Sequence, residues 1–102
     1  MIPIEDITLG RIPPHSLEAE QSVLGAMIID RKAIYAAVEL LQPEDFYKEA
    51  NKEIFEAILS LFNRNEPVDI ITLSEELKKR GTLENVGGVS YLTDLSGGVA
   101  TT

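Results

Sequence analysis

The chain has 102 residues, of which 44% are hydrophobic and 25% charged, as expected for one small globular domain with a modest core. Its 17 acidic and 9 basic residues give a formal net charge of −8. This charge disfavours direct binding to nucleic acid, because Lys and Arg drive such binding. The absence of cysteine excludes disulfides and cysteine metal sites and agrees with a cytoplasmic location.

The sequence divides into three parts. We predict a flexible arm over residues 1–12, a globular helical domain over 13–96 and the start of a linker over 97–102. Glu5 and Asp6 lie where a secretory signal would carry Lys or Arg. No apolar run approaches the roughly 20 residues that span a bilayer. We therefore expect neither a signal peptide nor contact with a membrane.

The first helix is predicted to begin after Ser16, whose hydroxyl can cap it. Glu18 and Glu20 fall in its first turn, where the helix dipole favours solvated acids. The helix then becomes apolar on nearly all sides from Val23 to Ile29, which indicates a buried helix. Gly25 in this run costs helix stability, and we expect the close approach of another helix as compensation.

Two amphipathic helices follow, over Arg31–Leu41 and Ala50–Arg64, with apolar residues repeating at helical spacing. Between them, a turn or one short helical turn at Pro43–Phe46 is expected to direct Phe46 and Tyr47 into the core. Asn65 is suited to the left-handed residue that ends the third helix.

A fourth helix is predicted to begin at the capping box Thr72–Glu75 and to run to Arg80, with residues 68–71 extended before it. A short helix over Val89–Leu95 follows two glycines. The expected fold class is therefore all-α, a compact orthogonal bundle of about five or six helices.

Several blocks in this order resemble a known family. They read RIPPHSLEAEQSVLGAMIID at 11–30, LQPEDFY at 41–47, IFEAILSL at 54–61, EPVDIITLSEELKKRG at 66–81 and GGVSYL at 87–92. Together they are similar to the N-terminal domain of the bacterial replicative DNA helicases of the DnaB type. We expect the chain to be the globular head of that domain, without the helical hairpin that follows it in the family.

The resemblance implies a role in a larger machine. Helicases of this type are hexameric, ATP-driven enzymes of chromosome replication, and their N-terminal domains form a collar that contacts other subunits and the C-terminal domain of primase. The resemblance also places ATP and Mg²⁺ in a separate motor domain. None of the seven glycines here precedes a lysine, so the chain has no P-loop, and we predict that it is not an enzyme by itself.

The residues themselves offer little chemistry, and we assign no catalytic, cofactor-binding or metal-binding residue. His15 is the only histidine and is interpreted as an exposed loop residue, because a metal site needs several converging ligands. Ser16 and Thr72 have no base beside them in the sequence, and capping explains both.

A small helix-turn-helix DNA-binding domain is the alternative. Thr72–Gly81 resembles its first helix, and the basic cluster Lys78–Arg80 could contact phosphate. We favour the other interpretation, in which the cluster complements the helix dipole and pairs with Glu75 and Glu76. The next helix would have to read bases, but Val89–Leu95 has no Lys or Arg. A structural helical domain without a partner is a third possibility. We expect little or no DNA binding.

Three residues are candidates for a protein interface. Tyr91 and Leu92 lie on a helix too short to bury every face, so one of them is expected to stay partly exposed, although core packing is the alternative for both. Glu18 is an acid on an exposed first turn, suited to a basic partner. The resemblance to the helicase family adds weight to the interface role of Tyr91.

Overall fold

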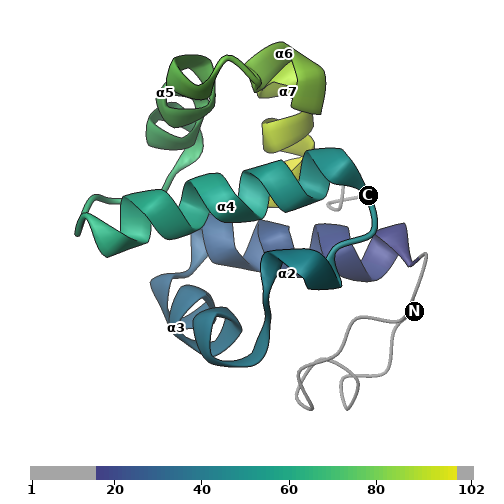
Figure 1. The fold of residues 1–102 in the computed structure, drawn as a ribbon, viewed down its shortest axis with the longest axis vertical. Coiled ribbons are helices and arrows are strands. Elements are labelled where there is room, and N and C mark those ends of the chain that lie inside the picture. The colour runs from purple at the N-terminus through teal and green to yellow at the C-terminus, as the bar shows by residue number, and fades with distance from the viewer. Residues whose placement is uncertain (1–15, 99–102) are drawn as a thin grey trace.

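The computed structural model describes residues 16–98 and contains helices and no strand within that range (Figure 1). This confirms the predicted all-α class. The α-helices are α2 (Leu17–Ile29), α3 (Arg31–Leu40), α4 (Glu49–Asn63), α5 (Ile70–Arg80), α6 (Leu83–Val86) and α7 (Gly88–Thr93). A single 3₁₀ turn, η1 (Pro43–Asp45), precedes α4, and a last turn, η2 (Asp94–Gly98), follows α7. His15 and the predicted arm over residues 1–12 lie outside the described residues.

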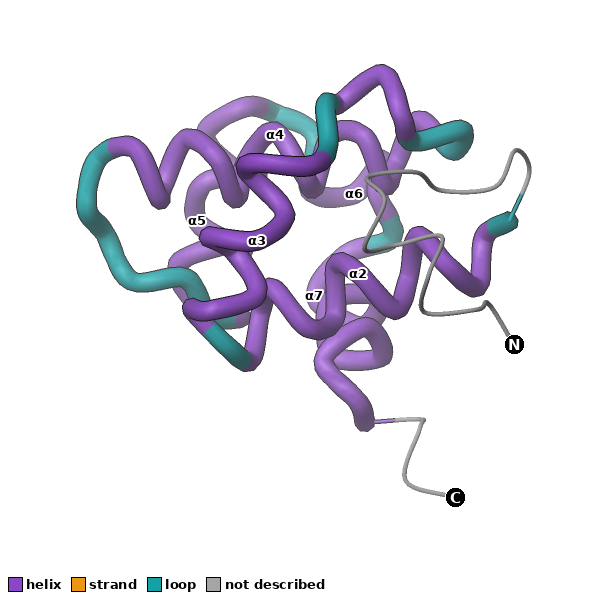
Figure 2. The backbone as a smooth tube through the Cα atoms, turned by 90° about the horizontal axis from the view of Figure 1, so that it is seen from below, coloured by secondary structure: helices purple, strands orange, loops and turns teal. Residues whose placement is uncertain are grey.

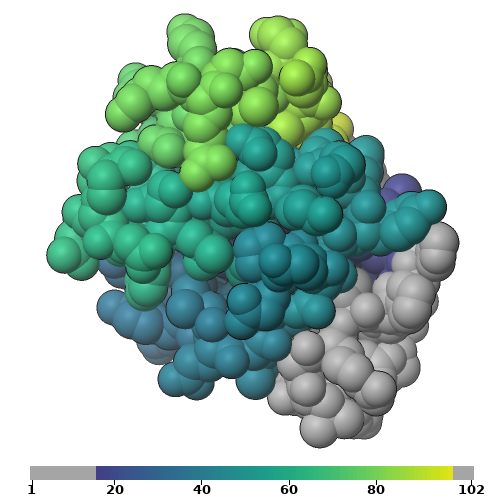
Figure 3. Space-filling view, viewed as in Figure 1, coloured from purple at the N-terminus to yellow at the C-terminus, as the bar shows by residue number. Residues whose placement is uncertain are grey.

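Helix α4 is the centre of the bundle. It crosses the face of the molecule in Figures 1 and 3, with α3 on one side, α5 to α7 on the other and α2 behind it. The tube in Figure 2 shows α4 along one edge of the molecule in that view, with the helices joined by loops. The fully buried side chains of α4 that form this core are Ile54, Phe55, Ala57 and Ile58. Their spacing is that of one helical face, as the sequence predicts.

The expected close approach at Gly25 is confirmed, and its partner is the last turn of the domain. A Cβ atom placed on Gly25 would collide with the carbonyl oxygen of Leu95 in η2. Helix α2 and η2 therefore meet through backbone atoms, which explains why a residue without a side chain lies in the middle of a buried helix.

The start of α5 differs from the prediction. Asp69 caps the helix, its carboxylate accepting a hydrogen bond from the N–H of Thr72 at 2.8 Å, while the hydroxyl of Thr72 accepts one from the N–H of Asp69 at 3.0 Å. Ile70 and Ile71 are thus helical, not extended. The wrong assignment arose because Asp69–Thr72 and Thr72–Glu75 both have the spacing of a capping box. The first is used, and it lets Ile70 pack against the core.

One further expectation was wrong, and one helix was missed. Phe46 enters the core and packs against Phe55 with ring centroids 4.8 Å apart, but Tyr47 stays 61% exposed. The short helix α6 was not predicted from the sequence. It ends at Gly87, which has a φ of 118° and so turns the chain sharply into α7. Asn65 and Gly81 adopt the left-handed conformation after α4 and α5, as expected.

Candidate protein-interaction site

The candidate site is built around Tyr91 of α7, which is half-buried and held from several sides. Its hydroxyl donates a hydrogen bond to Oδ1 of Asn51 in α4 at 2.6 Å and accepts one from Nε2 of Gln21 in α2 at 3.4 Å. The ammonium group of Lys48 lies 4.9 Å from the centre of its ring, within the range of a cation–π contact. One aromatic side chain therefore joins three helices at the surface.

Beneath Tyr91 lies a buried carboxylate that the sequence interpretation placed in solvent. Glu20 is 0% exposed, and the expectation of a solvated first-turn acid is wrong for this residue. Its side chain accepts hydrogen bonds from the backbone N–H of Tyr47 at 2.6 Å, from that of Lys48 at 3.4 Å and from Nδ2 of Asn51 at 2.8 Å.

Two of these donors are the backbone N–H groups of the two residues just before α4, and the third is the side chain of Asn51 in its first turn. Lys48, the capping residue of α4, makes no side-chain capping hydrogen bond. Glu20 of α2 therefore accepts the backbone N–H of the capping residue itself, and places its carboxylate at the end of α4 where the dipole favours a negative group. Asn51 connects Glu20 to Tyr91, because its Nδ2 donates a hydrogen bond to Glu20 and its Oδ1 accepts one from the hydroxyl of Tyr91. We call Glu20, Asn51 and Tyr91 the buried polar cluster.

The three predicted interface residues have different surroundings. Glu18 is exposed on the first turn of α2, and Tyr91 is partly exposed on α7. Leu92 is 0% exposed in the core and offers no surface to a partner, so its choice as an interface residue is corrected. The expectation that one of the two neighbours stays partly exposed is confirmed, and that residue is Tyr91.

A second polar cluster joins α4 and α5, with Glu76 buried and its two arginine partners partly exposed. The carboxylate of Glu76 forms ion pairs with Nη2 of Arg64 at 2.8 Å and with Nε of Arg80 at 3.2 Å. Nη1 of Arg80 also pairs with Oε2 of Glu53 at 3.2 Å. The hydrogen bond from Arg64 lowers the pKa of Glu76 against the opposing effect of its burial, and the hydrogen bond from Arg80 lowers that pKa further. We call Glu76, Arg64, Arg80 and Glu53 the solvent-facing ion cluster.

This ion cluster accounts for part of the basic run at Lys78–Arg80. Arg80 turns toward α4 and is engaged with acids, while Lys78 and Lys79 are exposed. The next helices, α6 and α7, carry no Lys or Arg. The arrangement lacks the basic recognition helix that the helix-turn-helix alternative requires.

The described residues contain no group of three or more metal-binding side chains, and no helix among them is long and apolar enough to cross a membrane. Hydrogen bonds, ion pairs and capping account for the polar side chains of the two clusters. Within residues 16–98 the fold is that of a helical domain whose two polar clusters join its helices.

Comparisons with known proteins place this domain. Residues 12–102 match the family described as the DnaB-like helicase N terminal domain, and the chain belongs to that family. It is 52% identical over 91 residues to the replicative DNA helicase DnaB of Geobacillus stearothermophilus, covering 89% of this chain and 20% of that protein. It is 46% identical over 96 residues to the replicative DNA helicase DnaC of Bacillus subtilis, covering 94% of this chain and 21% of that protein.

A solved structure agrees with this assignment. The crystal structure of the N-terminal domain of DnaB helicase from Mycobacterium tuberculosis superposes with a TM-score of 0.80 at 46% identity, covering 83% of this chain and 62% of that one. The chain spans about a fifth of the length of the two helicases it matches. The family resemblance and the predicted fold are thus confirmed.

Proposed function

We propose that this domain acts as the N-terminal collar of a hexameric replicative helicase, where it contacts other subunits and docks the C-terminal domain of primase. In this proposal, DNA unwinding with ATP and Mg²⁺ belongs to a motor domain outside residues 1–102. Family membership supports the assignment, and the absence of a P-loop supports the division of labour.

The observation that carries the docking role is the way in which Tyr91 is held. An interface aromatic binds most tightly when its rotamer is fixed before the partner arrives, because less side-chain freedom is then lost. Hydrogen bonds to Asn51 and Gln21, together with Lys48 over the ring, fix Tyr91 in this way. Exposed Glu18 supplies an acid for a basic partner on the first turn of α2, which also carries Gln21.

The test is titration of this chain with the C-terminal domain of primase, monitored by calorimetry. Tyr91→Ala removes the ring and is expected to weaken binding about tenfold or more, the range of an interface hot spot. Glu18→Lys is expected to weaken binding and to change its salt dependence. Circular dichroism and thermal unfolding of each variant report whether the fold is kept.

The matched control is Glu84→Lys, which makes the same charge change at an exposed position of α6. Wild-type binding that neither Tyr91→Ala nor Glu18→Lys alters would reject the site while leaving the partner in place. Failure of the wild-type chain to bind primase would reject the docking role.

Direct DNA binding is not part of this proposal. With a net charge of −8 and Arg80 engaged with acids, the chain is expected to leave labelled duplex unshifted at low salt. A salt-dependent shift, lost on replacing Lys78 and Lys79 with glutamine, would instead support the helix-turn-helix alternative.

A further inference from the structure

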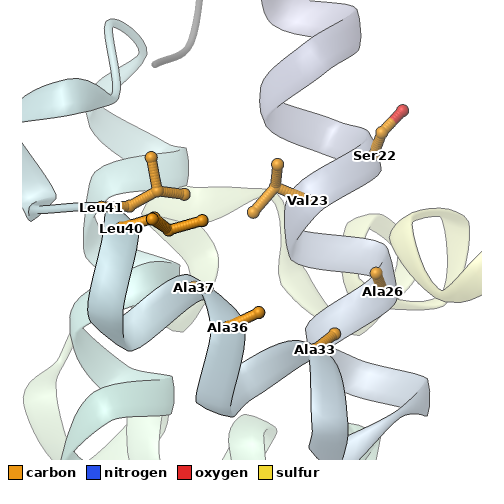
Figure 4. Close-up of a pocket in the computed structure, with 8 residues that line it drawn as sticks. All are labelled: Ser22, Val23, Ala26, Ala33, Ala36, Ala37, Leu40 and Leu41. Atoms are coloured by element: carbon orange, nitrogen blue, oxygen red, sulfur yellow. The ribbon is translucent and has the colours of Figure 1, made fainter. Parts of the chain in front are cut away.

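A second surface lies away from Tyr91, between α2 and α3. Figure 4 shows the hollow there, with Val23 of α2 facing Leu40 at the end of α3 and Leu41 just after it, and Ala33 and Ala36 toward its other end. Its volume is about 180 Å³, and seven of its eight lining residues are Ala, Val or Leu. Small-molecule sites usually have volumes of about 300–1,000 Å³, so this hollow fits inserted side chains better than a cofactor.

The apolar surface continues beyond the hollow. Ile29 follows Ala26 by three residues on α2 and therefore lies on the same side of the helix. Its side chain is 69% exposed, and with Ile71 of α5, which is 70% exposed, it lines a neighbouring hollow of about 450 Å³. Two large aliphatic side chains exposed beside one hollow differ from the scattered apolar residues of an ordinary surface, and they indicate a binding face.

Charge at the rim favours one kind of partner. Helix α3 ends at Leu40 with exposed Glu39 in its last turn and no basic residue there, so the negative end of the helix dipole is reinforced. At the other end of the groove Lys32 is exposed, whereas Arg31 lies 5.1 Å from the centre of the Phe62 ring. A cation is therefore favoured beside Leu40.

We propose that the α2–α3 groove binds an amphipathic helix of another protein, with Leu, Ile or Met side chains inserted between Val23 and Ala36 and a Lys or Arg beside Glu39. A helix suits the groove because its residues at i, i+3 and i+4 form a narrow apolar ridge. A second copy of this chain is disfavoured, because each copy carries a net charge of −8. The residues that line the groove do not include Tyr91, so this proposal can fail independently of primase docking.

The probe is a synthetic peptide of about 14 residues, long enough to form a helix, with leucine at every third or fourth position and lysine elsewhere. Amide shifts in a two-dimensional NMR titration should concentrate in residues 22–41. Ala36→Lys, at an exposed helical position, should weaken binding about tenfold, and Glu39→Lys should do so to a similar degree.

Matched controls separate this groove from general attraction between an acidic protein and a basic peptide. Ser90→Lys and Glu84→Lys change the net charge by the same amounts as Ala36→Lys and Glu39→Lys, at exposed positions of α7 and α6. Both controls should bind within about twofold of wild type. A peptide with glutamate in place of lysine should bind at least about tenfold more weakly.

Equal weakening by the controls, or shifts centred outside residues 22–41, would overturn the proposal. Equal binding of the glutamate peptide would overturn the choice of a basic partner. A wild-type dimer in sedimentation that Ala36→Lys dissociates would overturn it in favour of a second copy.

Discussion

The buried polar cluster and the solvent-facing ion cluster both join α4 to its neighbours, but they do so by different physics. In the first, Glu20 lies in the core, and its hydrogen-bond donors within residues 16–98 are backbone and amide N–H groups. In the second, Glu76 and Glu53 meet the guanidinium groups of Arg64 and Arg80, which remain partly in contact with water.

The difference shows that charge alone does not predict what holds the helices together. A buried group that loses its partner leaves desolvated donors without acceptors, whereas groups near solvent can turn to water instead. The cluster with no counter-charge among its partners is therefore expected to matter more for stability than the one with several ion pairs.

The largest effect is expected for Glu20→Ala. It leaves three N–H donors around α4 without an acceptor and opens a cavity, and we expect it to lower the free energy of unfolding by about 3 kcal/mol. Chemical denaturation followed by circular dichroism measures this. Glu18→Ala, two residues earlier and exposed, is the matched control. If Glu20→Ala lowered the free energy of unfolding by less than Glu18→Ala does, the greater contribution assigned to the buried polar cluster would be contradicted.

A smaller effect is expected for Tyr91→Phe, which keeps the ring and removes the hydroxyl. Asn51 loses a donor and Gln21 an acceptor, and a loss of about 1 kcal/mol follows. Thermal unfolding at matched protein concentration measures it. Tyr35→Phe on α3 is the control. Because the ring remains, primase binding should fall less than with Tyr91→Ala, and equal losses would show that the hydroxyl itself is the contact.

The smallest effect is expected for Glu76→Gln, with a loss of about 1 kcal/mol or less at neutral pH because its arginine partners stay partly in water. The loss should shrink further at high salt. The effect of Glu20→Ala should change little with salt, since its hydrogen-bond donors are uncharged. Similar salt sensitivity of the two variants would contradict the proposed difference.

Low pH should also change the difference in stability between wild type and Glu76→Gln. The folded pKa of Glu76 is lowered from its ordinary value of 4.5, so the unfolded chain binds the proton first as pH falls. The stability that Glu76 contributes is therefore complete above this value and is lost as pH falls below it toward the folded pKa. The difference in unfolding free energy between wild type and Glu76→Gln should narrow from pH 7 to pH 3, and a constant difference would refute this account.

Helical spacing predicted the main helices, because their buried faces repeat at the helix period. The same helical spacing also indicates that two polar residues of the buried polar cluster lie on core faces. Glu20 lies three and four residues before Val23 and Leu24, and Asn51 stands in the same relation to Ile54 and Phe55, so both fall on core faces.

What the sequence could not supply was the partner of each buried polar group. Glu20 accepts a hydrogen bond from Tyr47, which lies 27 residues later in the sequence, just before α4. No local sequence rule connects residues this far apart. The start of α5 was misplaced for another reason, since two capping signals overlap and only packing of Ile70 separates them. The sequence also did not show which of the two neighbouring interface candidates is buried. In the structure Leu92 lies in the core and Tyr91 is partly exposed at the surface.

The hydrogen bonds of Glu20 at the beginning of α4 have a consequence for the order in which the chain folds. Because α4 lacks a side-chain cap of its own, a peptide containing only its residues should fray at its first turn in water. We therefore expect the first turn of the central helix to become ordered when α2 docks against it. Folding is thus expected to be cooperative, with these two distant segments acquiring their final structure in a single step.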